Sequence, residues 1–271
     1  MIPAAFEYVR ADSVDAALAA LTEHGDDAKL LAGGMSLIPL MKLRLATPTV
    51  LVDVGRLRDL SYVRDGGDHV AIGALTRHRD LEISDVLAQH CPSLQGVAGE
   101  VGDNQVRHRG TLGGSVAHGD PASDLPAVLL ALDATLVAQG PGGERTIPVA
   151  DFFEGFLETT LAPDELLTEI RVPKATGGWN YQKFNRRAQD WAIVGAVVVN
   201  NGSTRVSLVN MGSTPLRASA VEAALASGAS IEDAAQAAAD GTEPPADLNA
   251  SPEYREHLAR VLVRRALEAA S

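Results

Sequence analysis

The sequence has 271 residues, of which 46% are hydrophobic, so the chain can bury a substantial core and is not of the disordered class. Its formal net charge of -12 supplies no basic surface for neutralising nucleic-acid phosphates, and it disfavours anionic membrane surfaces. The sequence contains no apolar run as long as the roughly 18 residues of a membrane span, so we expect none.

The first 55 residues predict a small α/β unit. An amphipathic helix is expected over residues 13–24, with Ser13 as a suitable N-cap. A short apolar strand over 29–32 runs into a pair of glycines, a second helix is expected over 36–45, and a strand over 49–54. This order of strand, glycines, helix and strand is typical of α/β proteins.

Residues 56–175 predict a larger α+β unit. A hairpin is expected from residues 61–64 and 69–73. Helices are expected over 77–87, 92–99 and 123–132, and further strands over 134–139, 146–149 and 166–172. The proline and glycines of residues 173–178 indicate a linker. A first domain of residues 1–175 is therefore predicted, with subdomains of about 1–55 and 56–175.

Residues 176–271 predict a second domain. Three strands are expected over 180–184, 192–200 and 205–211, and the last two meet at Asn201-Gly202, a strong hairpin signal. Helices are expected at residues 219–227, 230–240 and 252–270. The predicted fold class is α+β, in which the two-part first domain precedes an α+β C-terminal domain with a three-stranded sheet and helices.

Two glycine pairs interrupt these elements, in the segments Ala32–Ser36 and Thr111–Ser115. Paired glycines let successive N–H groups face one concavity, and such nests bind anions, especially at the start of a helix. Two such loops could hold the two phosphates of a pyrophosphate, although each could also be a tight turn. Neither the glycine pattern of a Rossmann site nor that of a phosphate-binding P-loop is present.

Cys91 is the only cysteine, so the chain can form no intrachain disulfide and supplies too few thiolates for an iron–sulfur cluster or a cysteine-rich zinc site. Its apolar neighbours predict a buried, unreactive thiol. The sequence shows no signal peptide, and we expect a cytoplasmic protein. The spacing of the histidines suggests no metal site. His108 and His118, near the second glycine pair, could lie near a bound cofactor, although a structural role is favoured.

Several segments together resemble the flavoprotein subunits of the molybdenum hydroxylases, a family that includes the medium subunit of aerobic carbon monoxide dehydrogenase and the FAD domain of xanthine dehydrogenase. The resemblance runs through the chain in the same order, at residues 31–42, 44–48, 109–115, 120–126, 181–187, 190–192 and 254–267. It implies that the first domain binds FAD.

The resemblance also implies roles for individual residues. The loop residues surround the FAD diphosphate, Asp124 meets the ribityl or ribose hydroxyls, and Leu167 and Trp191 line the isoalloxazine ring. Lys183 would stabilise negative charge on reduced flavin or on phosphate. The full set of expected cofactor-binding residues is Ala32, Gly33, Gly34, Met35, Ser36, Thr111, Gly113, Gly114, Ser115, Asp124, Leu167, Lys183 and Trp191.

Each of these side chains also has a structural alternative. Asp124 could support the start of the helix over 123–132, Trp191 and Leu167 could be core residues, and Lys183 could be a solvated charge or a subunit contact. Met35 departs from the family, which commonly has histidine there. That change keeps the backbone donors but loses an imidazole.

The function implied by the resemblance is electron transfer within a complex, without a catalytic acid or base on this chain. A large partner subunit would carry the molybdenum cofactor and a small one the iron–sulfur clusters, in a dimer of heterotrimers. The residues 44–48 favour aerobic carbon monoxide dehydrogenase as the complex. Two alternatives stay open, a free-standing FAD oxidoreductase and an assembly subunit that has lost FAD.

Overall fold

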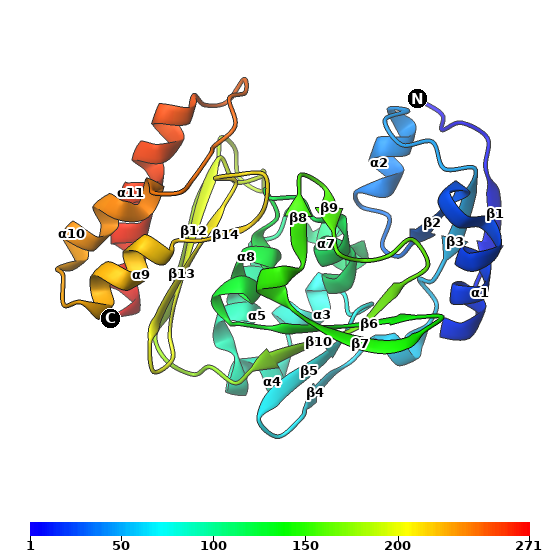
Figure 1. Ribbon diagram of the computed structural model, residues 1–271, viewed down its shortest axis with the longest axis horizontal. Helices are drawn as coiled ribbons and strands as arrows, with labels where there is room; N and C mark the ends of the chain where they lie inside the picture. The colour runs from blue at the N-terminus through cyan, green and yellow to red at the C-terminus, as the bar shows by residue number, and fades with distance from the viewer.

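The computed structural model describes residues 1–271 and is elongated, with the N-terminal and C-terminal units at opposite ends of a central unit (Figure 1). In the N-terminal unit, β1 (Glu7–Arg10) and β2 (Ala28–Leu31) flank β3 (Val50–Asp53) in a parallel sheet. α1 (Val14–His24) connects β1 to β2, as parallel strands require, and α2 (Leu37–Lys42) follows β2.

The central unit is built on a five-stranded antiparallel sheet. Its order is β4-β5-β10-β6-β7, with bounds Val63–Asp65, His69–Gly73, Leu166–Pro173, Thr135–Gly140 and Gly143–Pro148. Alternation along β10 buries Ile170 and Val172 on one face, and it leaves Glu169 and Arg171 on the other, where they pair with each other at 2.6 Å.

Six short helices lie between β5 and β6 in the chain and cover the apolar face of that sheet. They are α3 (His78–Glu82), α4 (Asp85–His90), α5 (Pro92–Gly99), α6 (Asn104–Arg109), α7 (Leu112–His118) and α8 (Asp124–Ala131). A small hairpin of β8 (Phe153–Gly155) and β9 (Glu158–Thr159) packs beside α7. α8 is buried along its whole length because the C-terminal sheet covers its second side.

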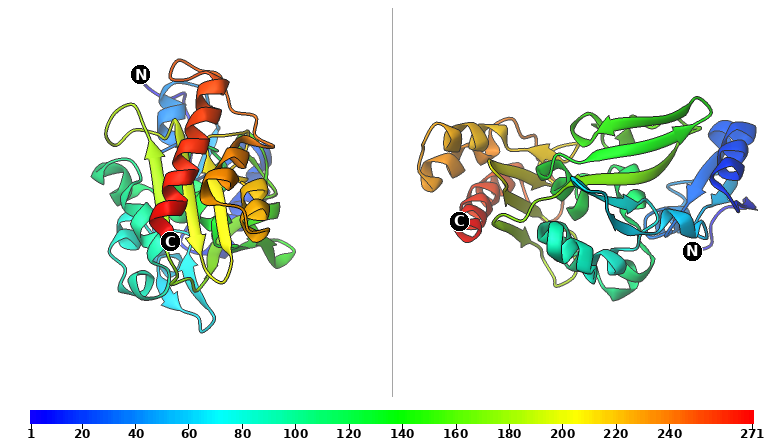
Figure 2. Two further views of the ribbon diagram at one scale, coloured as in Figure 1. Left: turned by 90° about the vertical axis from the view of Figure 1, so that its left-hand side faces the viewer. Right: turned by 90° about the horizontal axis from the view of Figure 1, so that it is seen from below.

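The C-terminal unit is a sheet with helices on its outer face. The strands β11 (Trp179–Phe184), β12 (Val194–Asn200), β13 (Thr204–Val209) and β14 (Leu216–Arg217) pair in this order, all antiparallel. The helices are α9 (Ser219–Ala226), α10 (Ile231–Gln236) and α11 (Pro252–Ala270). Figure 2 shows α11 packed against the sheet, where it contacts β11 and β12. No helix of the chain is both long and apolar enough to cross a bilayer.

Three clusters of buried hydrophobic residues hold the units together. The central cluster extends into the C-terminal unit through Val197, Val199 and Val209. The opposite face of the same sheet, with Val198 and Leu208, belongs to the C-terminal cluster. The two units thus share an apolar interface, and the division of the chain at residue 175 into separate domains stays a prediction.

Most elements agree with the sequence analysis, and the differences have local causes. The single helix expected over residues 77–87 is two helices, because Ser84 caps α4 by accepting a hydrogen bond from Leu87 N at 3.3 Å. α2 ends at Lys42, since Arg44 has a φ of 59° and leaves the helical conformation. β14 adds a two-residue fourth strand to the three that were predicted for the C-terminal sheet.

Candidate functional site

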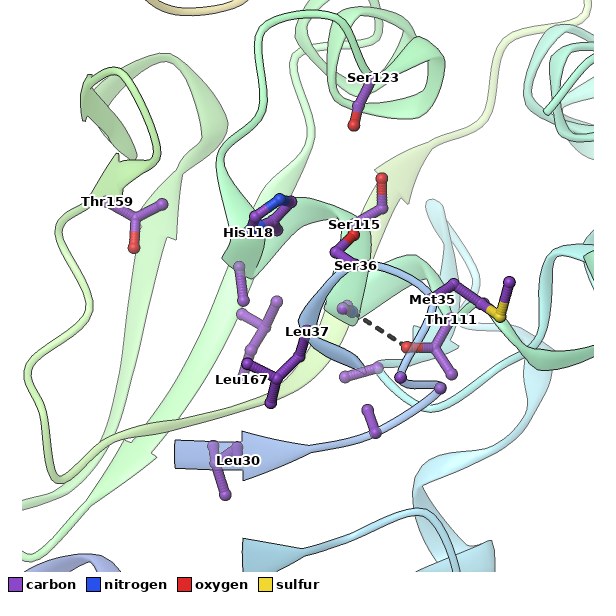
Figure 3. Close-up of a pocket in the computed structure, with 18 of the residues that line it drawn as sticks. Leu30, Met35, Ser36, Leu37, Thr111, Ser115, His118, Ser123, Thr159 and Leu167 are labelled. Atoms are coloured by element: carbon purple, nitrogen blue, oxygen red, sulfur yellow. Dashed lines mark hydrogen bonds between the residues drawn. The ribbon is translucent and has the colours of Figure 1, made fainter. Parts of the chain in front are cut away.

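A cleft of about 1010 Å³ opens where the three units meet. Small-molecule sites enclose roughly 300–1,000 Å³, so this cleft has room for a large, extended ligand. Figure 3 shows part of its lining. All the expected cofactor-binding residues lie along it: Ala32, Gly33, Gly34, Met35, Ser36, Thr111, Gly113, Gly114, Ser115, Asp124, Leu167, Lys183 and Trp191.

The first glycine pair lies between β2 and α2, where it lets the backbone pass close to the backbone of Arg109. A Cβ atom at Gly33 would lie 2.2 Å from the carbonyl oxygen of Arg109, so no side chain fits there. Gly34 has a φ of +76°, in the left-handed region that favours glycine. The two glycines therefore fix the path of this loop across the second glycine-rich segment.

The same loop presents unpaired backbone donors. The N–H groups of residues 33–37 donate no hydrogen bond to a protein acceptor. Ser36 occupies the N-cap position of α2, and its hydroxyl makes no capping bond. Five successive free donors and a free hydroxyl line the cleft, which gives this wall the partial positive charge that attracts an anion.

The second glycine pair lies in the first turn of α7, whereas the sequence predicted a loop with free N–H groups or a tight turn. Thr111 caps α7, and Gly114 N donates to its Oγ1 at 3.1 Å. Gly113 N donates to Ala74 O at 2.8 Å, and Ser115 N donates to Thr111 O at 3.0 Å. These three N–H groups are therefore not free for an anion, because the pair forms the first turn of a helix. The hydroxyls of Thr111 and Ser115 remain to face the cleft.

Asp124 and Lys183 form a buried ion pair on the cleft wall, with both side chains 7% exposed and 3.0 Å between Lys183 Nζ and Asp124 Oδ2. Tyr181 donates its hydroxyl hydrogen to the other carboxylate oxygen, and Lys183 also donates to Glu100 O at 3.0 Å. Burial raises the pKa of Asp124, and the ammonium and phenol counteract this shift. The N-cap of α8 is Ser123, so Asp124 links two units instead of capping a helix.

Two apolar side chains complete the predicted set. Leu167, on β10, is 4% exposed, and Figure 3 shows it at the cleft beside Leu37 and Leu30. Trp191 follows β11 and is 57% exposed, so it is not a core tryptophan. An exposed indole at the edge of a cleft offers a flat apolar surface for an aromatic ring.

Three further residues of this site were outside the expected set. Tyr181 is two residues from Lys183 on β11, and the two-residue period of a strand was a signal that both share a face. His118 lines the cleft, three residues after Ser115 on α7, whereas the sequence interpretation favoured a structural role over a place near the cofactor. His78 also lines it, with burial lowering the pKa of its imidazole to about 4.

Other ionisable groups do not form a metal site. Across residues 1–271, no group of three or more histidine, cysteine, aspartate or glutamate side chains lies close enough together to hold a metal ion. Cys91 is fully buried, and burial raises the pKa of its thiol. The buried position expected from the sequence is confirmed, and the low reactivity of the thiol stays a prediction.

Comparison with known families matches both parts of the chain. Residues 4–175 match the FAD binding domain in molybdopterin dehydrogenase, and residues 179–270 match the carbon monoxide dehydrogenase flavoprotein C-terminal domain.

Individual relatives extend over the full length. The chain is 44% identical to the carbon monoxide dehydrogenase medium chain of Hydrogenophaga pseudoflava, over 100% of this chain and 98% of the relative. It is 40% identical to the 6-hydroxypseudooxynicotine dehydrogenase complex subunit alpha of Paenarthrobacter nicotinovorans, over 98% and 95%. The carbon monoxide dehydrogenase structure from Hydrogenophaga pseudoflava superimposes with a TM-score of 0.96 at 45% identity, covering 100% and 98% of the two chains.

A more distant structure has the same fold, since quinoline 2-oxidoreductase from Pseudomonas putida 86 superimposes with a TM-score of 0.93 at 29% identity, over 100% and 98% of the chains. Both family models, the full-length relatives and the cleft agree with the resemblance found in the sequence. The chain belongs to the FAD-binding medium subunits of the molybdenum hydroxylase family of oxidoreductases.

Proposed function

We propose that this chain takes electrons from iron–sulfur clusters of a small partner subunit and passes them from FAD to a terminal acceptor. A large partner subunit would hold the molybdenum cofactor at which the substrate is oxidised. The observation that carries the proposal is the loop of five free backbone donors on a cleft large enough for a dinucleotide. FAD supplies the chemistry, because a flavin exchanges electrons both singly and in pairs.

The residues of the cleft fit the parts of this cofactor. We assign the diphosphate to the donors of residues 33–37 and to the hydroxyls of Thr111 and Ser115, since phosphate oxygens accept hydrogen bonds. Asp124 and Lys183 would orient the ribityl hydroxyls and place a positive charge near the flavin. Leu167 and Trp191 would pack against the isoalloxazine ring.

The cysteine content of this chain supports placing the iron–sulfur clusters on another subunit. Its single cysteine cannot ligate a cluster, so the clusters would lie on another subunit. The relatives named as medium chain and as complex subunit belong to multi-subunit enzymes. On this basis we propose a dimer of heterotrimers in the cytoplasm, whose reducing conditions suit the free thiol.

Aerobic carbon monoxide dehydrogenase is the complex that we propose, on the identity of 44% to a medium chain of that enzyme. The alternatives are a free-standing FAD oxidoreductase and an assembly subunit without FAD. The cleft contains the loop donors that the second alternative would not need. We find no group in it that must act as a substrate acid or base.

One preparation tests these proposals. The chain is purified alone and with the products of the neighbouring genes, and each sample's visible spectrum and metal content are measured after gel filtration. We expect flavin bands in both samples, with iron–sulfur absorbance and molybdenum only in the complex. Colourless protein in both would exclude FAD binding, and substrate oxidation by the chain alone would favour the free-standing enzyme. Dye reduction by the complex with carbon monoxide, but not with aldehydes or N-heterocycles, would identify the substrate.

A further inference from the structure

His118 lines the cleft, where it can contact a ligand, which is the alternative to the structural role favoured by the sequence interpretation. It ends α7, the helix whose first turn carries the second glycine pair. Ser115 lies three residues earlier, so the two side chains share one side of the helix. Both line the cleft, and Figure 3 shows the imidazole beside Ser115 and Ser36. The ring therefore belongs to the wall that faces the proposed diphosphate.

The imidazole has no hydrogen-bond partner within the protein. His118 is half-buried, and neither ring nitrogen makes a hydrogen bond, whereas His108 on the preceding helix bonds to Asn104 O at 2.6 Å. Its ring nitrogens are not fully enclosed by protein, so they can reach water or a ligand that completes the hydrogen bonding of the ring. A ligand acceptor in the cleft would complete it.

The surroundings of His118 favour the uncharged imidazole in the absence of a ligand. Burial lowers the pKa of its imidazole, and the charge of Lys29, from β2, lowers it further. Asp120, two residues away, raises it without reversing the shift. The other elements packed against α7 bring Glu158 from β9 and Asp124 from α8, and the Asp124 carboxylate is already paired with Lys183.

We propose that His118 is a diphosphate contact of FAD and takes up a proton when the cofactor binds. This inference rests on the proposed function. A diphosphate brings two negative charges into a cleft whose lining has few cations, namely Lys29 and Lys183, against seven carboxylates. A nearby anion favours the charged form of histidine and raises its pKa, so His118 is protonated to a greater extent in the bound state than in the free state.

Linkage fixes the sign of the pH dependence. Between the lower pKa of free His118 and the higher pKa of the bound state, FAD binding takes up a proton, so affinity strengthens as pH falls. The dissociation constant should rise by up to about tenfold per pH unit across this window and level off above it. Burial lowers the pKa of His78, the other cleft histidine, to about 4, so its ligand-free form is neutral over this window.

The test measures FAD binding to the full chain without its cofactor, by flavin fluorescence, between about pH 5.5 and 8.5, a range that brackets the ordinary histidine pKa. We expect wild-type affinity to weaken with pH, and His118→Gln to bind several-fold more weakly at the acidic end with a flat profile. His108→Gln is the matched control and should keep the wild-type profile, because His108 does not line the cleft.

Calorimetry in two buffers of different ionisation enthalpy gives a second measurement, the number of protons taken up. Wild type should take up a fraction of a proton at acidic pH, and His118→Gln should take up none. His118→Asn replaces the glutamine variant if the latter fails to fold, as judged by its thermal midpoint without FAD. An unchanged pH profile and unchanged proton uptake in these variants would overturn the inference. Absence of FAD binding by the wild type would instead refute the proposed function.

Discussion

The backbone approach at Gly33 makes this residue the most sensitive single position of the first loop. Alanine there would put its Cβ 2.2 Å from Arg109 O, and a backbone atom cannot rotate away as a side chain can. We expect Gly33→Ala to lower the free energy of unfolding by about 1–3 kcal/mol and to weaken FAD binding, because the free N–H groups move with the loop.

Urea unfolding and FAD titration check this prediction. Gly142→Ala is the matched control, since its Cβ would meet no atom within 4 Å and it should leave stability and binding unchanged. Equal FAD affinity of Gly33→Ala and wild type would show that the loop path is not needed for binding.

The buried ion pair on the cleft wall predicts a pH-dependent loss of stability. Lys183→Met leaves the Asp124 carboxylate, 7% exposed, without its cation, and breaking a buried pair in this way costs about 3–5 kcal/mol. Loss of the ammonium raises the folded-state pKa of Asp124 further, adding to the effect of burial. The stability that a raised carboxyl pKa brings is present at low pH and lost as pH rises, so the deficit should shrink on acidification.

Urea unfolding of Lys183→Met and wild type at neutral and acidic pH measures that deficit. Asp124→Asn with Lys183→Met is the paired control and should be more stable than Lys183→Met alone, because no buried charge is left unpaired. A deficit that is the same at both pH values would show that Asp124 carries no uncompensated charge in the variant.

At the scale of elements, Thr111 is the N-cap of α7 and fixes the helical conformation of the second glycine pair. Its hydroxyl accepts from Gly114 N at 3.1 Å, and loss of such a cap typically costs about 1 kcal/mol. Thr111→Ala should therefore be destabilised by about that amount in chemical unfolding, and it should release FAD faster because α7 frays at the cleft. Thr111→Ser keeps the oxygen and should match wild type in both measurements. If Thr111→Ala releases FAD at the wild-type rate, the N-cap of α7 is not needed to retain the cofactor.

The helix α7 was not predicted from the sequence. The glycines of the segment 111–115 were recognised, but α7 was not, because glycine is a poor helix former and the tertiary contacts of Gly113 with Ala74 override this propensity. The hairpin at Asn201-Gly202 was predicted correctly, since its turn signal is local. The strands β8, β9 and β14 have two or three residues, too few to show a period.

At the site, the sequence placed all the expected cofactor residues on what proved to be one cleft, because the family motifs mark them directly. Their contacts with FAD stay predictions. The ring of His118 and the phenol of Tyr181 were left out of the expected set. The first makes no hydrogen bond within the protein and the second bonds to a residue of another unit, and neither feature is visible in a single segment.

At the scale of the whole molecule, the net negative charge of the protein repels FAD, whereas the backbone donors of the first loop attract it. The chain has a formal net charge of -12, and the cleft lining is itself acidic, with Asp26, Glu158 and Asp190 among its carboxylates. FAD, which carries a negative diphosphate, is repelled during its approach and attracted only when it reaches the loop donors. Salt screens the long-range repulsion, with a Debye length of about 30 Å at 0.01 M and about 8 Å at 0.15 M, more than it screens contacts inside the cleft.

The association rate of FAD should therefore rise several-fold between about 0.01 M and 0.15 M salt, the reverse of the decrease expected for an anion steered by a basic surface. Stopped-flow fluorescence measures this rate with the full chain. Riboflavin, which has the same ring system without phosphate, is the matched control and should associate at a rate independent of salt. A rate for FAD that falls with salt would mean that the free donors of residues 33–37 and the charge of Lys29 dominate the field at the mouth of the cleft over the net charge of the molecule.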